Sequence, residues 1–339
     1  MTNVTADPHP FAQFIKILGR GKTLTRSLTI EEAEQAMRMI LAGEALPEQV
    51  GAFLMLLRLK EETGAEIAGF VRAVQAFLQM PAALPRVDVD WSSYAGKRRQ
   101  LPWFILATRI LAQNGWRVVM HGSEGHTAGR LYTRTVLTQL GLPVAASLEE
   151  AATQVARANF SYVPLEAMSP KVAELIDLRP ILGLRSPAHT LARLINPFAA
   201  ATSVQAVFHP GYMAIHRDAS ILLGEQRMVV FRGEGGEAER RPNKPSDVIF
   251  LSRGKIAEER WPALIPEPRQ GVDDNMDPAR LEAVWRGEAS DDYGEAAVTG
   301  TLAIALRAMG IDQDMEAAQA HAGHLWRVRD RQRLAAAAS

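Results

Sequence analysis

The chain has 339 residues, with 38 Lys and Arg against 38 Asp and Glu, so its formal net charge is zero. This length is enough for one large domain or two, and the neutral balance means that any polyanion site must come from local segregation of charge. The absence of cysteine excludes disulfides and thiolate metal sites and is typical of a reducing compartment. No signal-peptide pattern and no apolar run of roughly 18 residues is present, so we expect a cytoplasmic protein without a membrane partner.

Residues 11–80 are predicted to be helical. Thr29 is the expected N-cap of a helix that ends at Gly43, and Glu32 occupies the capping-box position three residues later. Apolar residues at helical spacing predict two further helices at residues 47–59 and 63–78. We expect these helices to form a scaffold and a dimer surface.

From residue 86 onward, short β-rich runs alternate with helical patterns. Strands are predicted at residues 87–89, 117–120, 161–164, 203–208, 227–232 and 247–252. Helices are predicted between or after them at residues 102–114, 126–140, 211–223 and 292–309. This alternation predicts an α/β domain with a mainly parallel central sheet, interrupted by a helical stretch at residues 167–195.

Residues 179–197 read R-P-I-L-G-L-R-S-P-A-H-T-L-A-R-L-I-N-P. This segment resembles, without a gap, the R-x-x-L-G-x-R-T-x-x-N-x-L-G-P-L-x-N-P motif of the anthranilate phosphoribosyltransferases, and the resemblance extends from about residue 11 to residue 309. It departs at His189, Ala192 and Arg193, where the family has Asn, Gly and Pro. The resemblance implies a homodimer with a small helical N-terminal domain (residues 1–82 and about 167–195) and a larger α/β domain (residues 83–166 and 196–339).

The first loop that the resemblance assigns to the diphosphate follows the strand at residues 87–89. The family carries G-T-G-G-D there, whereas this chain reads D-W-S-S-Y-A-G-K-R-R-Q-L-P-W-F from residue 90. One glycine remains, and Lys97, Arg98 and Arg99 arrive, which predicts that a cationic surface replaces the backbone cradle for pyrophosphate. Trp91, Tyr94 and Trp103 are candidates for stacking on unpaired bases, although Trp103 at a helix start is expected more often in a core.

The second and third loops depart from the family as well. The family's K-H-G-N-R becomes M-H-G-S-E at residues 120–124, which leaves His121, either a structural turn residue or a phosphate contact, with Gly122 and Ser123. The metal-binding H-G-x-D-G-L-D-E aligns with R-G-E-G-G-E-A-E at residues 232–239, so that Glu239 stands alone before two arginines. One carboxylate beside two guanidiniums is a poor Mg²⁺ site, and we expect no cofactor.

Positive charge accumulates in these segments instead. Residues 97–134 hold seven Lys or Arg against one acid, whereas residues 267–295 hold nine Asp or Glu against three Arg. We therefore predict one basic groove between the domains, with the compensating acids elsewhere. The predicted phosphate-binding residues are Lys97, Arg98, Arg99, His121, Gly122, Ser123, Arg179, Arg185, His189, Arg193, Arg232, Arg240, Arg241 and Lys244. Of these, His189 is equally compatible with a hydrogen-bonded core position, and Arg179 matches the family's anthranilate contact.

The degraded loops together with R-R-P-N-K-P at residues 240–245 resemble the YbiB-like branch of the family. That resemblance implies a protein without the transferase activity that binds single-stranded DNA or RNA with little sequence preference. The alternative is a phosphoribosyl or glycosyl transferase that uses phosphoribosyl pyrophosphate, with or without Mg²⁺, on another acceptor. A nucleoside phosphorylase of the same fold is a third possibility, and nothing in the sequence specifies its nucleoside pocket.

Overall fold

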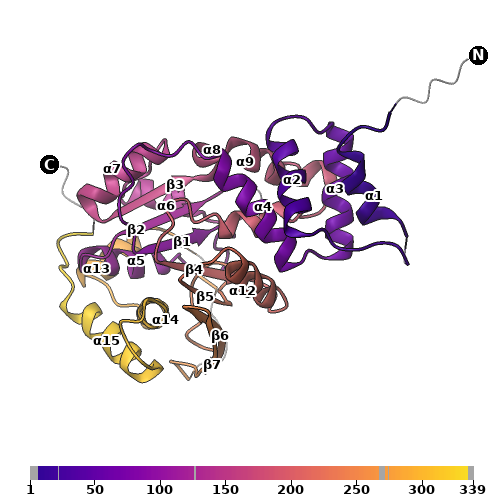
Figure 1. Cartoon of the computed structure of the whole chain (residues 1–339). Coiled ribbons are helices and arrows are strands. Elements are labelled where there is room, and N and C mark those ends of the chain that lie inside the picture. Colours follow the sequence, from indigo (N-terminus) through magenta and orange to yellow (C-terminus); the bar gives the residue numbers. More distant parts are fainter. Residues whose placement is uncertain (1–6, 22, 126, 267–271, 274, 335–339) are drawn as a thin grey trace, which may run out of the picture.

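The structure, a computed structural model, describes residues 7–21, 23–125, 127–266, 272–273 and 275–334. Helices and a sheet form two parts that lie side by side, with the N-terminal helices at the right of Figure 1 and the sheet at the left. The N-terminal part consists of α1 (Ala12–Gly19), α2 (Ile30–Leu41), α3 (Pro47–Lys60) and α4 (Gly64–Phe77). The helices predicted in this region are confirmed to within two residues at each end.

A buried carboxylate joins three of these helices. Thr29 and Glu32 form the predicted capping box at the start of α2, and Glu66 completes the same arrangement at the start of α4. Glu66 is fully buried, accepts a hydrogen bond from the backbone N–H of Leu28 at 2.9 Å and pairs with Lys60 of α3 at 2.9 Å. Because a buried charge is tolerated only when it is paired and hydrogen-bonded, this network fixes the ends of α2, α3 and α4 relative to one another.

The second part is built on one seven-stranded sheet with the order β3-β2-β1-β4-β5-β6-β7. Its strands are β1 (Val89–Ser93), β2 (Val118–Gly122), β3 (Phe160–Pro164), β4 (Thr202–Val207), β5 (Arg227–Arg232), β6 (Ser246–Ser252) and β7 (Lys255–Trp261). The strands β3, β2, β1, β4 and β5 pair in parallel, and β6 and β7 add two antiparallel pairings at the edge. The predicted mainly parallel α/β sheet is confirmed.

Helices cover both faces of this sheet. They are α5 (Phe104–Gln113), α6 (Thr133–Gln139), α7 (Leu148–Ala158), α12 (Tyr212–Leu222), α13 (Ala279–Arg286), α14 (Asp292–Met309) and α15 (Met315–Val328). Alternate residues of each strand enter different cores, as the period of two requires: Val118 and Met120 of β2 pack with α5 and α14, whereas Val119 packs in the core that contains α2 and α4. One apolar core therefore runs from the N-terminal helices onto the sheet, and the exact domain boundaries stay a prediction.

The chain returns to the helical part between β3 and β4. This segment contains α8 (Leu165–Met168), α9 (Pro170–Asp177), α10 (Arg179–Leu182), α11 (Ala188–Leu191) and the 3₁₀ turn η1 (Ala192–Leu194). Helix α11 packs against α4, and η1 contacts β1 and β4. The carboxyl ends of the central strands, which face the helical part in Figure 1, are thereby brought against the residues of the recognised segment 179–197.

The structure differs from the expected elements at several places. Strand β1 extends to Ser93, beyond the predicted residues 87–89, and β7, α7 and α13 were not predicted. The helix expected at residues 126–140 begins only at Thr133, and His126 lies outside the described residues. Within the described part of the chain, no helix is long and apolar enough to cross a bilayer.

Candidate anion-binding site

The loop after β1 keeps backbone N–H groups that converge on one carboxylate. The N–H of Ala95 donates to Glu237 Oε1 at 2.7 Å, and the N–H of Gly96 donates to the same oxygen. Glu237 is only 1% exposed. Converging backbone N–H groups are the usual means of binding a phosphate. In this chain an internal carboxylate already satisfies them.

Lys97 does not belong to a cationic surface, and that expectation is wrong. Its side chain is 1% exposed, and its ammonium group pairs with both Glu234 and Glu239. The second oxygen of Glu239 accepts a hydrogen bond from the backbone N–H of Phe104 at 2.9 Å. The two neighbouring carboxylates raise the pKa of Lys97 against the opposing effect of its burial. Lys97 is therefore a buried charged residue that holds two loops together.

This arrangement does not fit Mg²⁺. The carboxylates Glu234 and Glu239 are the residues that would bind the ion in this loop, and the ammonium group of Lys97 lies between them. Magnesium requires oxygen ligands in a near-octahedral arrangement, which a cation at the centre of the site prevents. Among the described residues, no group of three or more His, Asp or Glu side chains could hold a metal ion. Sequence reasoning found Glu239 but missed Glu234 and Glu237.

The second loop is also largely internal. His121 is fully buried, with Nδ1 2.7 Å from the Tyr94 hydroxyl and Nε2 3.3 Å from Asp90 Oδ2. A Cβ atom at Gly122 would overlap the carbonyl oxygen of Ser93, so the glycine is required by close strand packing. His121 is thus a structural residue, and of this loop Ser123 lines an open hollow of about 640 Å³ beneath α9.

The aromatic residues predicted to stack on bases lie in the interior. Trp91 and Trp103 are fully buried in the core with α5 and α14, and Tyr94 is 2% exposed. The stacking prediction is therefore wrong for Trp91 and Tyr94, and the core position expected for Trp103 is confirmed. Trp91 belongs to β1 rather than to the loop, because the strand runs longer than expected.

The third loop divides into buried and exposed cations. Arg240 is 1% exposed, lies over the Trp261 ring at 5.0 Å and donates to Gln319 and to the carbonyl of Pro262, so it too is wrongly assigned to a groove. Arg232, at the end of β5, and Lys244 are exposed, as are Arg98 and Arg99 of the first loop, and Arg241 is half-buried. Burial and then the charges of Arg232 and Arg99 lower the pKa of Arg241, which shows that these three cations lie near one another.

Acidic residues of the segment 267–295, which were predicted to lie away from the cations, are close to the first loop. The backbone N–H of Asp273 donates to the carbonyl of Arg99 at 2.8 Å, and Asp273 and Asp291 both pair with Arg280. Glu267 and Asp274 of the same acidic segment lie outside the described residues. The segregation of charge is therefore incomplete here, and this loop is not the centre of a uniformly basic groove.

A second group of cations, here called the arginine cluster, consists of Arg130, Arg179, Arg185 and Arg193. Arg179 and Arg185 donate to the Thr127 hydroxyl at 2.6 and 3.4 Å. Burial, followed by the charges of Arg193, Arg179 and Arg130, lowers the pKa of Arg185 to about 10. The other three guanidinium groups thus lie close enough to Arg185 to disfavour its positive charge. Such a cluster is stabilised by an anion.

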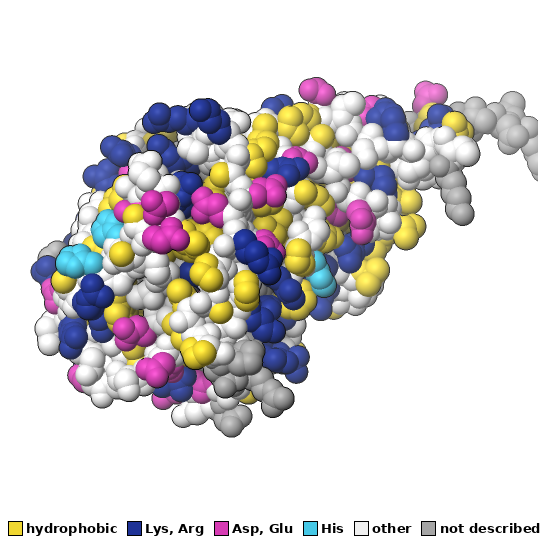
Figure 2. All heavy atoms as spheres, turned by 90° about the horizontal axis from the view of Figure 1, so that it is seen from below, with side chains coloured by type: hydrophobic (Ala, Val, Ile, Leu, Met, Phe, Trp, Pro, Cys, Tyr) yellow, Lys and Arg dark blue, Asp and Glu magenta, His cyan; other side chains and the backbone are white. Residues whose placement is uncertain are grey.

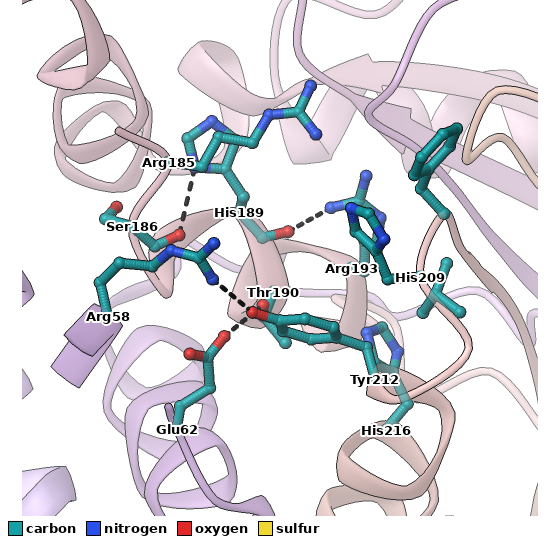
Figure 3. A pocket seen from close by; sticks show the side chains of 12 residues that line it. Arg58, Glu62, Arg185, Ser186, His189, Thr190, Arg193, His209, Tyr212 and His216 are labelled. Atoms are coloured by element: carbon teal, nitrogen blue, oxygen red, sulfur yellow. Dashed lines mark hydrogen bonds between the residues drawn. The ribbon is translucent and has the colours of Figure 1, made fainter. Parts of the chain in front are cut away.

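A pocket of about 140 Å³ adjoins this cluster at the carboxyl end of β4 (Figure 3). Its lining residues are Arg58, Glu62, Arg185, Ser186, His189, Thr190, Arg193, Val207, Phe208, His209, Tyr212 and His216. His189 Nδ1 donates to the Ser186 carbonyl at 3.2 Å, and Arg193 donates to the His189 carbonyl. Sequence reasoning missed Arg58 and Glu62. The only signal in the sequence was the charged end, R-L-K-E-E-T, of an otherwise apolar helix.

The predicted site residues therefore separate into three groups. The structure brings Arg179, Arg185, His189 and Arg193 together at the boundary between the two parts. It places Lys97, His121, Gly122, Ser123 and Arg240 in the interior and leaves Arg232 at the end of β5 and Arg98, Arg99, Arg241 and Lys244 on neighbouring loops. Figure 2 shows Lys and Arg side chains gathered on the face where the α/β part adjoins the helices.

Comparison with known proteins places this geometry in a family. Residues 12–78 match the helical bundle domain of the glycosyl transferase family. The chain is 30% identical to the anthranilate phosphoribosyltransferase of Oleidesulfovibrio alaskensis over 73% of each protein. It is also 30% identical to the uncharacterized protein YbiB of Escherichia coli, over 72% of this chain and 77% of YbiB.

Solved structures show the same fold. The anthranilate phosphoribosyltransferase of Thermus thermophilus superposes with a TM-score of 0.78 at 22% identity, over 96% of this chain and 97% of that one. The Saccharomyces cerevisiae enzyme, in complex with phosphoribosyl pyrophosphate and Mg, gives 0.77 at 15% identity, over 96% and 95%. The sequence match to full-length relatives and the shared fold lead to one conclusion: the chain belongs to the anthranilate phosphoribosyltransferase family.

Proposed function

We propose that this chain binds single-stranded nucleic acid, DNA or RNA, through its phosphates at the boundary between the helical and α/β parts. The observation that carries the proposal is the arginine cluster, in which Arg179 and Arg185 donate to the same Thr127 hydroxyl; burial, followed by the neighbouring guanidiniums, lowers the pKa of Arg185 to about 10. Phosphate oxygens relieve this repulsion, and guanidinium groups bind them with charge-assisted hydrogen bonds. Exposed Arg98, Arg99, Arg232 and Lys244 extend the positive surface along the strand ends.

The interior of the ancestral diphosphate site supports the same proposal. Glu237 accepts the N–H groups that a pyrophosphate would require, and Lys97 stands between the carboxylates that a metal would require. Both interactions are buried, so displacing them exposes unpaired charges in a medium of low polarity, which is costly. We therefore propose that nucleic-acid binding proceeds without Mg²⁺ or another cofactor and without group transfer.

The test is the salt dependence of binding to a single-stranded oligonucleotide, measured by fluorescence anisotropy. For single strands the logarithm of affinity falls with the logarithm of salt concentration by about 0.7 for each neutralised phosphate. The variant Arg179→Gln with Arg185→Gln should bind every sequence more weakly and reduce this slope by about 1.4, because two contacts are removed. The matched control, Lys255→Gln with Arg327→Gln, removes two exposed charges on β7 and α15 and should bind as the wild type does.

The competing function is transfer with phosphoribosyl pyrophosphate, which the anthranilate phosphoribosyltransferases among the relatives favour. Isothermal titration calorimetry with phosphoribosyl pyrophosphate, with and without Mg²⁺, separates the two functions. Two results together would contradict nucleic-acid binding and favour transferase activity. They are magnesium-dependent binding of phosphoribosyl pyrophosphate at micromolar concentration and an unchanged oligonucleotide affinity in the double arginine variant. Oligonucleotide binding that does not depend on Mg²⁺ supports the proposal of nucleic-acid binding.

A further inference from the structure

The pocket beside the arginine cluster has a composition that a continuous strand of phosphates does not require. It lies between α3, α11 and α12, with Arg58 and Glu62 from the helical part facing Arg185 and Arg193 across it (Figure 3). Three guanidiniums and one carboxylate line it, which gives a net charge of +2 without the imidazoles. Burial and then the charge of Arg193 lower the pKa of His216 to about 3, so this histidine adds no charge at neutral pH. A dianion matches the pocket better than a single phosphodiester or a zwitterion.

Glu62 adds a second condition that a ligand of this pocket must meet. The residue is 4% exposed, and its Oε1 accepts a hydrogen bond from the Thr190 hydroxyl at 2.8 Å. Its Oε2 is buried and makes no hydrogen bond within the described residues. A buried carboxylate oxygen without a donor is costly, and an ionised carboxylate can only accept. The ligand is therefore expected to present a donor beside its anionic group.

The volume of the pocket limits the size of its ligand. A cavity of about 140 Å³ is close to the size that accommodates a single six-membered ring. A sugar ring with its phosphate therefore reaches the polar groups, while a base attached to the sugar extends toward the open side. Among anionic ligands with neighbouring hydroxyls, a phosphate monoester carries about −1.5 to −2 charge at neutral pH, which matches the net charge of the lining.

We propose that this pocket binds a ribose phosphate monoester, with the phosphate on Arg58, Arg185 and Arg193 and a ribose hydroxyl donating to Glu62. The proposal rests on the proposed function, because it assigns the pocket to the 5′-phosphorylated end of a bound RNA strand. A free ribonucleoside monophosphate offers the same chemistry. The 2′-hydroxyl is the group by which a protein distinguishes RNA from DNA, so Glu62 becomes a specificity-determining residue.

The phosphate half is tested with 3′-labelled RNA 12-mers that carry either a 5′-phosphate or a 5′-hydroxyl. The wild type should bind the phosphorylated strand about tenfold more tightly, as expected for one additional set of charge-assisted hydrogen bonds. Arg58→Gln should abolish this preference, so that the ratio of the affinities for the two strands falls to about one. Arg20→Gln, which removes an exposed charge beside α1, should keep the preference. Equal affinity of the wild type for both strands would overturn the assignment.

The hydroxyl half is tested with Glu62→Gln, which keeps an acceptor for Thr190 but replaces the carboxylate. The wild type should prefer 5′-phosphorylated RNA over DNA of the same sequence, and the variant should lose most of this ratio while retaining the preference for a 5′-phosphate. A ratio that is unchanged in the variant, or absent in the wild type, would contradict the role of Glu62. Thermal unfolding of each variant, compared with the wild type, shows whether the fold is retained.

Competition with adenosine monophosphate identifies the source of the ligand and separates the two proposals. Displacement of only the 5′-phosphate-dependent part of oligonucleotide binding supports an RNA end as the ligand. Tight binding of the mononucleotide without any oligonucleotide binding would contradict nucleic-acid binding and retain the pocket assignment. Salt-dependent binding of strands irrespective of their 5′ end would retain nucleic-acid binding and overturn the pocket assignment.

Discussion

Lys97 owes its environment to residues that lie far along the chain. Its ammonium group is buried between Glu234 and Glu239, and Glu239 also accepts the N–H of Phe104 at the start of α5. The same three charges are expected to hold the β1–α5 loop against the loop after β5. Because the ion pairs are inaccessible to water, removing one partner leaves uncompensated charges in the interior.

We expect Lys97→Met to lower the free energy of unfolding by about 3–5 kcal/mol, the usual cost of breaking a buried ion pair from one side. The loss should be larger at pH 8 than at pH 5, because burial raises the pKa of Glu239 to about 7 and its protonation at the lower pH relieves its repulsion with Glu234. Urea unfolding at both pH values measures it. Lys244→Met, at an exposed position of a neighbouring loop, should change stability by less than about 0.5 kcal/mol. A similar small change for Lys97→Met would show that the ion pairs contribute little.

Glu225 makes stability depend on pH. Its carboxylate accepts a hydrogen bond from the buried Ser203 hydroxyl at 2.6 Å, and burial raises the pKa of Glu225 to about 7. A raised native pKa means that the folded protein holds a proton that the unfolded chain releases above about pH 4.3. The contribution of Glu225 to stability is therefore complete at low pH and is lost as the pH rises to about 7.

Glu225→Gln should remove this dependence, because the amide is neutral throughout and still hydrogen-bonds to Ser203. The urea midpoint of the variant should match that of the wild type near pH 4 and exceed it at pH 8. The difference between the two proteins isolates Glu225 from other titrating groups such as Glu239, whose pKa burial also raises to about 7. A constant difference across this range would contradict the assignment.

The loop between β1 and α5 has backbone N–H groups whose acceptor is a side-chain carboxylate of the same chain. The N–H groups of Ala95 and Gly96 still converge on one oxygen, but that oxygen belongs to Glu237. Gly96 has φ +67°, a conformation that glycine adopts without strain. The loop thus retains the turn that an anion site needs, with a side chain as the anion.

Glu237→Ala should therefore create a weak site for inorganic pyrophosphate. The exposed N–H groups of Ala95 and Gly96 would bind it, at a cost in stability of about 1–3 kcal/mol from the lost buried hydrogen bonds. Calorimetric titration of pyrophosphate should show tighter binding in Glu237→Ala than in the wild type. Glu258→Ala, which removes an exposed carboxylate of β7, is the control and should behave as the wild type. Equal affinities in all three proteins would show that the carboxylate does not occupy an anion site.

The regular elements could be predicted largely from local patterns, whereas the site could not. The boundaries of β5 and α14 agree with the sequence prediction residue for residue, since their apolar periodicity and flanking turns are strong. Strand β7 was missed because Lys255–Trp261 reads K-I-A-E-E-R-W, in which three charged residues in a row hide the period of two at a largely exposed sheet edge. The segment at residues 179–197 indicates the family from sequence alone, and its Arg179, Arg185 and Arg193 lie together in the structure.

What local pattern cannot provide is the partner of each charge. Counting cations predicted a groove that included Lys97 and Arg240, yet each of these is buried by contacts with residues at least about twenty positions away. The converse holds for Arg58 and Glu62, which looked like the polar end of a scaffold helix and line the pocket opposite Arg193. Whether a charged side chain is structural or free to bind depends on the tertiary fold, which the sequence pattern does not specify.

The whole molecule combines a neutral total charge with an uneven distribution. The net charge of zero gives no general attraction for a polyanion, so the proposed nucleic-acid binding depends on the boundary between the two parts, where the arginine cluster lies. The helical part also presents large apolar side chains to solvent. Leu59 on α3 is 84% exposed and Ile181 on α10 is 79% exposed, and α3 contacts α10 through Gly51 and Leu182.

These apolar side chains favour the proposed homodimer. Single exposed leucines are common on monomers, but neighbouring elements that both expose large apolar residues are typical of an interface. Leu59→Glu should convert a dimer into a monomer in sedimentation velocity experiments, because a buried unpaired carboxylate opposes association. Leu84→Glu, at a position that is 61% exposed between α4 and β1, should leave the assembly unchanged. A wild-type protein that remains monomeric at high concentration would contradict the dimer, and a Leu59→Glu variant that stays dimeric would place the interface on another face.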